Sequence, residues 1–268
     1  MATVLESNKT KIAKRVIEVF EFFDQSSRKA TVMDIVRRYG RPQSSTSELL
    51  ASLVEMGLLY KDARSRSYSP TPRLATLGAA AQPEIIRDGR LFAFMDRLAF
   101  STRHAVALFG TVGTHVQIFH WSQGQSPLTR NLASGAAEML SSSAAGLLLL
   151  STAENDQVRR ILWRLNAEAA ADAKFNPAEM ADRVAAFRRA KHASGASGFA
   201  ANLQVTAALL PCAPDERPLA LGLLYGADAA VDADALTATL QHGIAQCVAP
   251  EAIEAPAAAL RAPFMFAM

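Results

Sequence analysis

The sequence contains few of the features that mark secreted, zinc-binding or membrane proteins. Only two of its 268 residues are cysteines, Cys212 and Cys247, and neither lies in a Cys-x-x-Cys or Cys/His cluster. This excludes a disulfide scaffold and a zinc finger. Apolar runs such as Ala144 to Leu150 are far too short to cross a bilayer. The opening residues, MATVLESNKTK, carry charges where a signal peptide needs an apolar stretch, so we expect a cytoplasmic protein without membrane contact.

Catalytic and metal-binding patterns are also missing. The segment Ser194–Gly198 does not have the G-x-S-x-G spacing of a nucleophile elbow, and Gly110–Gly113 is not followed by the Gly-Lys-Ser/Thr of a phosphate loop. His115 and His120 flank an expected strand, but no Cys, Asp or Glu motif accompanies them to complete a metal site. No histidine is placed to activate Cys212. The sequence therefore predicts no catalytic set, no metal and no cofactor.

The residues that are present predict a globular protein with an uneven charge. Half of the chain is hydrophobic and a fifth is charged, which excludes intrinsic disorder, and the length favours two domains. Residues 1–80 hold 13 Lys and Arg against 8 Asp and Glu, whereas residues 81–268 hold 15 against 17. A basic first third suggests a part that meets a polyanion, although protein surfaces also differ by this much by chance.

Three short helices are expected in the first sixty residues. Apolar residues recur at helical spacing from Lys11 to Phe23. Thr31 and Asp34 have the spacing of a capping box at the start of a second helix, and Gly40 suits its end. Pro42 suits the opening of a third helix. The tight turn between the second and third helices is typical of a helix-turn-helix.

The third helix and the segment after it carry polar residues suited to DNA. The helix opens with the short side chains of Gln43 to Ser47, which can approach phosphates and base edges. The segment Lys61 to Tyr68 is typical of a wing whose arginines could reach phosphates or a minor groove. A helical bundle with a solvated loop is the open alternative. The predicted DNA-binding residues are Arg41, Gln43, Ser44, Ser45, Thr46, Ser47, Arg64, Arg66 and Tyr68.

A series of short motifs between Thr31 and Gly78 resembles one known family. They are Gly40-Arg41-Pro42, Ser44-Ser45, Leu49-Leu50, Leu53-Val54, Gly57-Leu58, Tyr68, Arg73-Leu74 and Leu77-Gly78. In these motifs the chain resembles the IclR family of bacterial transcription regulators. The resemblance implies an α+β fold. It places a winged helix-turn-helix DNA-binding domain in residues 1–80, a linker helix in 81–100, a GAF-like effector-binding domain with an antiparallel sheet in 101–250 and a tail in 251–268.

Two residues of the third helix depart from the family pattern. Glu48 stands where the family usually has a basic residue, and its carboxylate would repel phosphates but could accept a hydrogen bond from a cytosine amino group. Alternatively, Ser45 and Glu48 are three residues apart and could form a capping box. Gln43 stands where the family often has Lys or Arg. The arginines of the turn and the wing would then supply more of the attraction to phosphate.

Beyond the first domain the patterns alternate between helix and strand. We expect one amphipathic helix from Glu84 to Phe100. In the family this region links the domains and helps the protein dimerise, and ordinary core packing of its apolar face is the open alternative. A β-hairpin should follow, with its turn at Gly110–Gly113. The segment Ala144–Leu150 should form a buried helix, and Ser194–Phe199 resembles a turn of the family.

The start of the buried helix is the expected effector site. In relatives, small residues and amides line the pocket there; exposed N–H groups would suit an anionic ligand, whereas the serines could equally cap the helix. Leu223 and Tyr225 stand where relatives often have small polar residues. A small carboxylate needs several donors, so we expect an apolar or aromatic effector, or none. The effector-binding residues that follow from the resemblance are Phe109, Ser142, Ser143, Ala144, Ala145, Leu209, Leu223 and Tyr225.

These patterns together predict a DNA-binding transcription regulator. It would bind a palindromic operator in double-stranded DNA as a symmetric dimer or as a tetramer, under the control of a small-molecule effector. The alternative is a small-molecule-binding or assembly protein whose helix-turn-helix no longer binds DNA. A hydrolase that uses Ser197 is a third possibility, which no motif supports.

Overall fold

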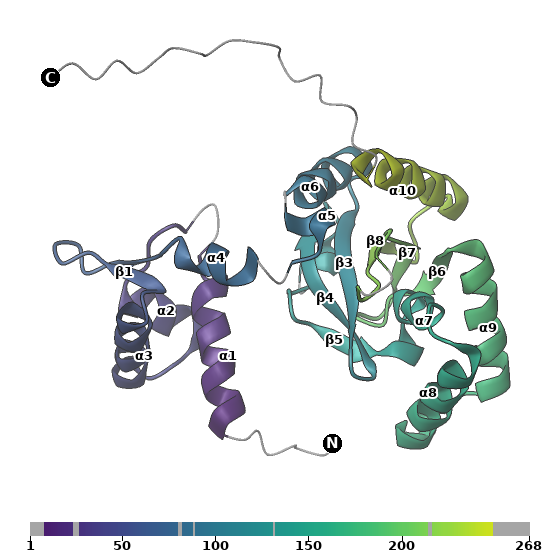
Figure 1. The fold of residues 1–268 in the computed structure, drawn as a ribbon, viewed down its shortest axis with the longest axis horizontal. Helices are drawn as coiled ribbons and strands as arrows, with labels where there is room; N and C mark the ends of the chain where they lie inside the picture. The colour runs from purple at the N-terminus through teal and green to yellow at the C-terminus, as the bar shows by residue number, and fades with distance from the viewer. Residues whose placement is uncertain are drawn as a thin grey trace, which may run out of the picture. The chain divides into compact units, whose positions relative to one another are not determined.

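The computed structural model divides the chain into two compact units, Met1–Gln82 and Pro83–Met268 (Figure 1). It describes residues 8–23, 27–79, 82–87, 89–130, 132–213 and 216–248. The expected tail, residues 251–268, lies outside the described residues. Each unit has its own hydrophobic core and is described by itself.

The first unit is a group of three helices followed by a two-stranded antiparallel hairpin and a short helix (Figure 1). Its elements are α1 (Asn8–Glu21), α2 (Val32–Tyr39), α3 (Gln43–Glu55), β1 (Leu59–Lys61), β2 (Tyr68–Pro70) and α4 (Arg73–Ala79). The core comprises Val19, Ala30, Ile35, Leu50, Leu53, Leu59 and Tyr68. The expected helix-turn-helix and wing are confirmed.

Local signals fix the turn between α2 and α3. The Thr31 hydroxyl accepts a hydrogen bond from the N–H of Asp34, and the Asp34 carboxylate accepts one from the N–H of Thr31 at 2.8 Å, so the capping box is confirmed. The hydrogen bonds that the Asp34 carboxylate accepts from the N–H and the hydroxyl of Thr31 lower the pKa of Asp34 below its ordinary value. Gly40 ends α2 in the left-handed region, with a φ of 62°. Pro42 is the N-cap of α3, which places Ser45 inside the first turn, so the alternative capping box of Ser45 and Glu48 is wrong.

The second unit is built on a six-stranded antiparallel sheet in the order β5-β4-β3-β8-β7-β6. The strands are β3 (Ala105–Val112), β4 (His115–Ser122), β5 (Ala137–Met139), β6 (His192–Ala196), β7 (Leu203–Leu209) and β8 (Ala220–Gly226). The helices are α5 (Glu84–Arg87), α6 (Arg90–Thr102), α7 (Ala144–Leu150), α8 (Asn155–Glu168), α9 (Pro177–Ala190) and α10 (Ala233–Val248). Three short 3₁₀ segments are η1 (Pro127–Thr129), η2 (Leu140–Ser142) and η3 (Ala171–Ala173). The α+β class with an antiparallel, GAF-like sheet is confirmed.

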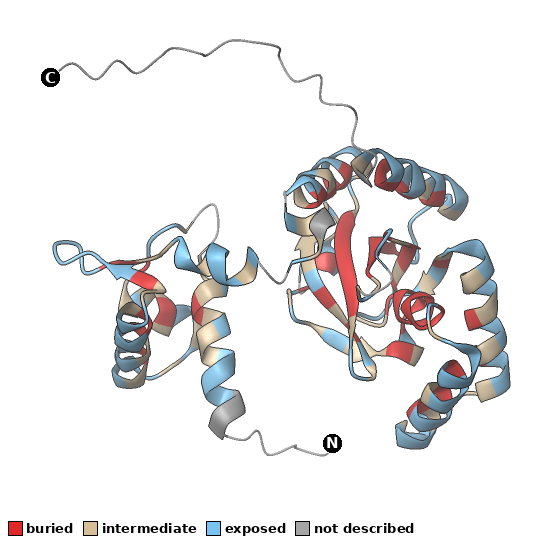
Figure 2. Cartoon of the chain, viewed as in Figure 1, coloured by how far each residue is buried: buried red, intermediate tan, exposed pale blue. Residues whose placement is uncertain are grey.

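Helices cover both faces of this sheet. One face packs against α7, and the other packs against α6 and α10 (Figure 1). Every residue of β8 is buried, because a strand covered on both sides has no solvent-facing residues (Figure 2). Successive side chains of a strand alternate between the two faces, so each strand contributes to two separate cores. The α7 face contains Phe109 and Leu224, whereas the α6/α10 face contains Leu108 and Leu223.

Three expected boundaries differ from the structure. The helix expected over Glu84–Phe100 is two helices, because Gly89 has a φ of 76° and interrupts it. Strand β3 continues through Gly110, so the turn lies at Gly113 rather than over Gly110–Gly113. Only glycine fits at position 110 of the strand, because a Cβ atom there would lie 2.2 Å from the Phe119 ring. Half of the turn expected over Ser194–Phe199 belongs instead to β6, which pairs with β7.

Candidate nucleic-acid interface and ligand pocket

The exposed side of α3 is polar and carries no positive charge. Gln43, Ser44 and Ser47 are exposed in its first turn and a half, as expected for residues that approach bases. The thirteen residues of α3 include no Lys or Arg, and the helix carries two exposed glutamates, Glu48 and Glu55. Attraction to phosphate must therefore come from residues outside this helix.

Two of the residues expected on the DNA-facing surface are buried instead. Thr46 is only 2% exposed, and its hydroxyl donates to the Pro42 carbonyl at 2.8 Å, so this side chain bonds back to its own helix. Tyr68 is 4% exposed and belongs to the core. Its backbone exchanges two hydrogen bonds with Ala30, at 2.7 and 3.0 Å, which join the wing to the helices. Both residues support the fold of the unit rather than present a surface.

The wing presents its two arginines to solvent. Arg64 and Arg66 are exposed in the loop between β1 and β2. Asp62 shapes this loop, because its carboxylate accepts hydrogen bonds from the backbone N–H groups of Arg64 at 2.8 Å and Ser65 at 3.3 Å. The same bonds hold the pKa of Asp62 below its ordinary value. Both guanidinium groups are thus carried on an ordered hairpin.

Arg41, in the turn before α3, is paired within the protein. Its Nη2 and Nε lie 2.6 and 3.2 Å from the two carboxylate oxygens of Glu18 on α1, a bidentate contact. The Arg41 side chain is 37% exposed, so it can still be approached from solvent. A phosphate would have to compete with Glu18 for this arginine.

Sequence reasoning missed the basic side of α1. Lys11, Lys14 and Arg15 line a pocket of about 430 Å³ that α1 shares with the start of α3. Arg15 donates from Nη2 to the Ser45 hydroxyl at 3.1 Å, so the expected DNA-binding residue Ser45 contacts α1. The signal was present as the run Lys-Ile-Ala-Lys-Arg, but we used this segment only for its apolar spacing.

Five of the expected effector residues lie together where α7 meets the sheet. Phe109, Ala144 and Ala145 are buried in one core. The Ser143 hydroxyl is buried and has no hydrogen-bond partner among the residues that the structure describes. Ser142 is exposed and donates to the Met139 carbonyl at 2.8 Å. Ser143 is the N-cap of α7 but makes no side-chain cap, so the capping role considered for this serine is wrong.

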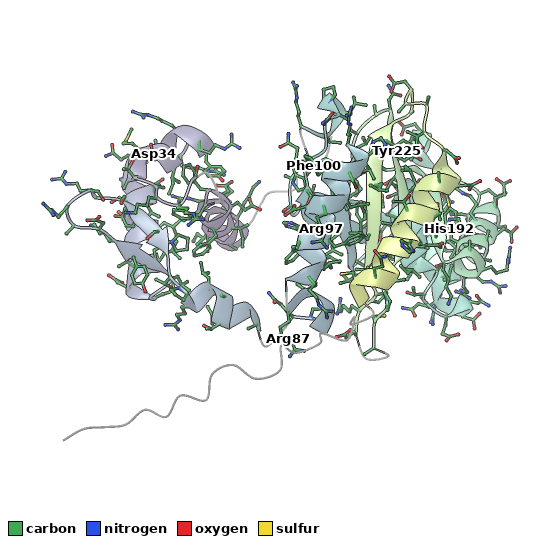
Figure 3. All side chains as sticks on the ribbon, turned by 90° about the horizontal axis from the view of Figure 1, so that it is seen from above. Asp34, Arg87, Arg97, Phe100, His192 and Tyr225 are labelled. Atoms are coloured by element: carbon green, nitrogen blue, oxygen red, sulfur yellow. The ribbon has the colours of Figure 1, made fainter. Side chains whose placement is uncertain are left out.

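Leu223 and Tyr225 lie on the opposite face of the sheet, against α6 and α10, and cannot line the same pocket. Leu223 belongs to the core on that face. Tyr225, two residues later, has the same orientation, and its hydroxyl lies 3.0 Å from that of Thr206 (Figure 3). The Thr206 hydroxyl lies 3.0 Å from that of Ser194, which completes a chain of three hydroxyl groups. The placement of these two expected residues is corrected accordingly.

Leu209 packs against the same core as Phe109, Ala144 and Ala145, and it also reaches a separate pocket. It lines a pocket of about 570 Å³ whose other residues are Ser151, Thr152, Ala153, Glu154, Arg188, Lys191, Leu210 and Pro211. Arg188 helps to shape this pocket, because its Nε donates to the Ser151 carbonyl at 2.7 Å and its other nitrogens contact Ala153 and Asn155. The eight expected effector residues therefore do not meet in one cavity.

Comparison with known proteins agrees with this geometry. Residues 13–63, which contain most of α1, all of α2 and α3 and the start of the wing, match the model of the IclR helix-turn-helix domain. Residues 13–63 therefore carry a helix-turn-helix domain of the IclR type.

Solved structures of IclR-type regulators extend the similarity of fold to the second unit. An IclR transcriptional regulator from Alicyclobacillus acidocaldarius is 19% identical with a TM-score of 0.58, over 90% of this chain and 97% of that one. An IclR homologue from Microbacterium hydrocarbonoxydans, complexed with 4-hydroxybenzoate, is 18% identical with a TM-score of 0.57, over 88% and 97%. The Thermotoga maritima IclR is 14% identical with a TM-score of 0.57, over 88% and 95%. None of the curated proteins matches the sequence.

The serine, histidine and cysteine residues considered for enzyme chemistry lie in separate places of the second unit. Ser197 is fully buried, and its hydroxyl accepts a hydrogen bond from the N–H of Phe199 at 3.3 Å. His115 is exposed, whereas His120 packs against Phe92 with ring centroids 4.5 Å apart. Cys212 is a free, exposed thiol. The described residues include no cluster of metal-ligating side chains, and no helix among them is long and apolar enough to cross a membrane.

Proposed function

We propose that this chain is a transcription regulator that binds a palindromic operator in double-stranded DNA as a symmetric dimer. The observation that carries the proposal is the exposed polar start of α3, in one compact unit with a hairpin that presents two arginines. A twofold dimer would place two α3 helices in successive major grooves, about one helical turn apart. Such a regulator works where the DNA is, in the bacterial cytoplasm, and needs no catalytic residue.

The exposed residues of the first unit divide between base and phosphate contacts. Gln43, Ser44 and Ser47 would contact base edges, and Glu48 would accept a hydrogen bond from a cytosine amino group. Arg64 and Arg66 would bind the DNA backbone. The buried Thr46 and Tyr68 have no role in this scheme beyond holding the unit together.

Self-association has a candidate surface in the second unit. Phe100, on α6, is 88% exposed and has the highest exposure of the exposed large hydrophobic residues described (Figure 3). We expect a second copy of the chain to cover it in the dimer or tetramer.

We propose that a small apolar or aromatic effector binds where α7 meets the sheet. Phe109, Ala144 and Ala145 are packed in an apolar core there, and the buried Ser143 hydroxyl has no hydrogen-bond partner among the described residues, so an effector would enter by displacing part of this packing. Few donors and an aromatic wall favour a ring over a small carboxylate. The IclR homologue that was solved with 4-hydroxybenzoate takes an aromatic ligand, although that ligand also carries a carboxylate.

The decisive experiment measures binding to a duplex from the chain's own upstream region as a function of salt. Wild type should bind at low ionic strength and lose affinity steeply as salt rises. Replacing Arg64 and Arg66 with Ala should weaken binding on all sequences and lower the slope of log affinity against log salt. An unchanged slope in this variant would remove the wing from the proposal.

The second candidate is a small-molecule-binding or assembly protein that has lost DNA binding. It is motivated by Glu48 and Glu55 on an α3 that carries no cation. A mobility shift with the same duplex at low ionic strength separates the two functions. Failure of wild type to bind would favour this candidate.

A further inference from the structure

The most basic hollow beside α3 is formed largely by α1. Lys11, Lys14 and Arg15 line it from α1, and Arg41, Pro42 and Ser45 line it from the turn and the first residues of α3. Four cationic side chains therefore surround a pocket of about 430 Å³ whose wall includes residues expected to face DNA. Glu18 offsets part of this charge, because it pairs with Arg41.

The backbone at the start of α3 adds to the positive potential of this pocket. Pro42 is the N-cap and provides no side-chain cap, and the first backbone bond of the helix runs from the N–H of Thr46 to the Pro42 carbonyl at 3.1 Å. The N–H groups of the three preceding residues have no acceptor within the helix. Because Pro42 and Ser45 line the pocket, the positive end of the helix dipole lies at its wall.

The pocket is also ordered by direct contacts. Arg15 donates to Ser45 and Arg41 is held by Glu18, so two of its four cations have defined positions. Lys11 and Lys14 are exposed at its rim. A second basic hollow, lined by Arg28, Lys29, Arg37 and Arg38, also contains the carboxylate of Asp34 and does not include the start of α3.

We propose that this pocket, formed by α1 and the start of α3, holds a phosphate of the DNA backbone while α3 lies in the major groove. It supplies the phosphate contact that α3 itself, with two glutamates and no cation, does not provide. The proposal rests on the proposed DNA-binding function and assigns part of it to α1. Phosphate contacts fix orientation on the duplex without selecting sequence, so the pocket contributes to affinity rather than specificity.

The test is the double variant Lys11→Ala/Lys14→Ala in the full chain. Each phosphate contact contributes about 0.9 to the slope of log affinity against log salt, so a dimer that loses both pockets should lose about 1.8. The loss should be equal on the upstream duplex and on a random duplex of the same length, because phosphates are common to both. The matched control is Arg159→Ala/Arg160→Ala on α8, two exposed cations of the second unit, which removes the same charge.

The outcomes distinguish this proposal from the function on which it rests. If the wild-type protein binds neither duplex, both the pocket proposal and the proposed DNA-binding function are overturned. Wild type that binds, with an unchanged slope in the α1 variant or an equal loss in the control, overturns only the pocket. A change of sedimentation in the α1 variant would make the pocket a contact between copies and also overturn it. Calorimetric titration with inorganic phosphate alone should show no binding, whereas saturable binding that the α1 variant abolishes would assign the pocket to a free anion.

Discussion

Replacing Gly146 with Ala should destabilise the second unit although it improves the helix propensity of α7. A Cβ atom at this position would lie 2.5 Å from the Leu140 carbonyl oxygen and 2.9 Å from the Leu140 Cα. Both are backbone atoms, so no rotamer change relieves the contact. Overpacking costs about 1–3 kcal/mol, and we expect the upper half of that range here. Ala recovers about 1 kcal/mol of helix propensity, which leaves a net loss of about 1–2 kcal/mol.

Thermal unfolding of the full chain, followed by circular dichroism, measures this effect. For a unit of this size, a loss of about 1–2 kcal/mol lowers the melting temperature by about 2–8 °C. Gly78→Ala in α4 is the matched control, because a Cβ there would meet only the Gln82 side chain, at an ordinary 3.5 Å. This control should stabilise the first unit by about 0.4–1 kcal/mol. A Gly146→Ala protein that melts at or above the wild-type temperature would refute the close-approach argument.

Three further substitutions test individual contacts. Glu18→Gln should release Arg41 from its ion pair, so binding to the duplex should tighten and its salt dependence should steepen. Weaker binding would instead show that the Arg41–Glu18 pair positions Arg41 for DNA. Burial lowers the pKa of His120, so the unfolded chain takes up its proton first and stability should fall as pH drops below about 6.5. His120→Phe should reduce this fall in denaturant midpoints, and equal falls in both proteins would contradict it. Ser143→Ala removes a buried hydroxyl that has no hydrogen-bond partner among the described residues. The free energy of unfolding should therefore stay unchanged or rise by up to about 1 kcal/mol. Effector binding, measured by titration, should weaken.

The helix-turn-helix could be predicted because its signals are local. Thr31 and Asp34 cap α2 through each other, and Gly40 ends it within one turn, so a few adjacent residues determine the geometry. One hairpin of the sheet, β3 and β4, followed from short β-rich runs separated by glycines, whereas the antiparallel sheet as a whole was implied by the family resemblance. The break at Gly89 was missed because the apolar spacing on either side of it is that of one continuous helix.

Site residues that depend on tertiary contacts were predicted less well. Leu223 and Tyr225 are in the expected strand but on the other face, because a shift of one residue reverses every side chain. Thr46 is a polar residue in a polar run, yet its position turns it inward, where its hydroxyl bonds to Pro42. The cations of α1 join the start of α3 only through folding, across about thirty residues of sequence, as the Arg15–Ser45 hydrogen bond shows.

Because α3 is acidic and contains no Lys or Arg, the residues that bind DNA of any sequence would differ from those that recognise a particular sequence. Cations on α1 and the wing would retain the protein on any duplex and let it slide along the chromosome in search of its site. Glu48 and Glu55 would make each non-matching groove less favourable to enter, because a carboxylate without a cytosine amino group as donor is left facing electronegative base edges. Substitutions in α3 could then change which operator the protein recognises without changing its non-specific affinity for double-stranded DNA.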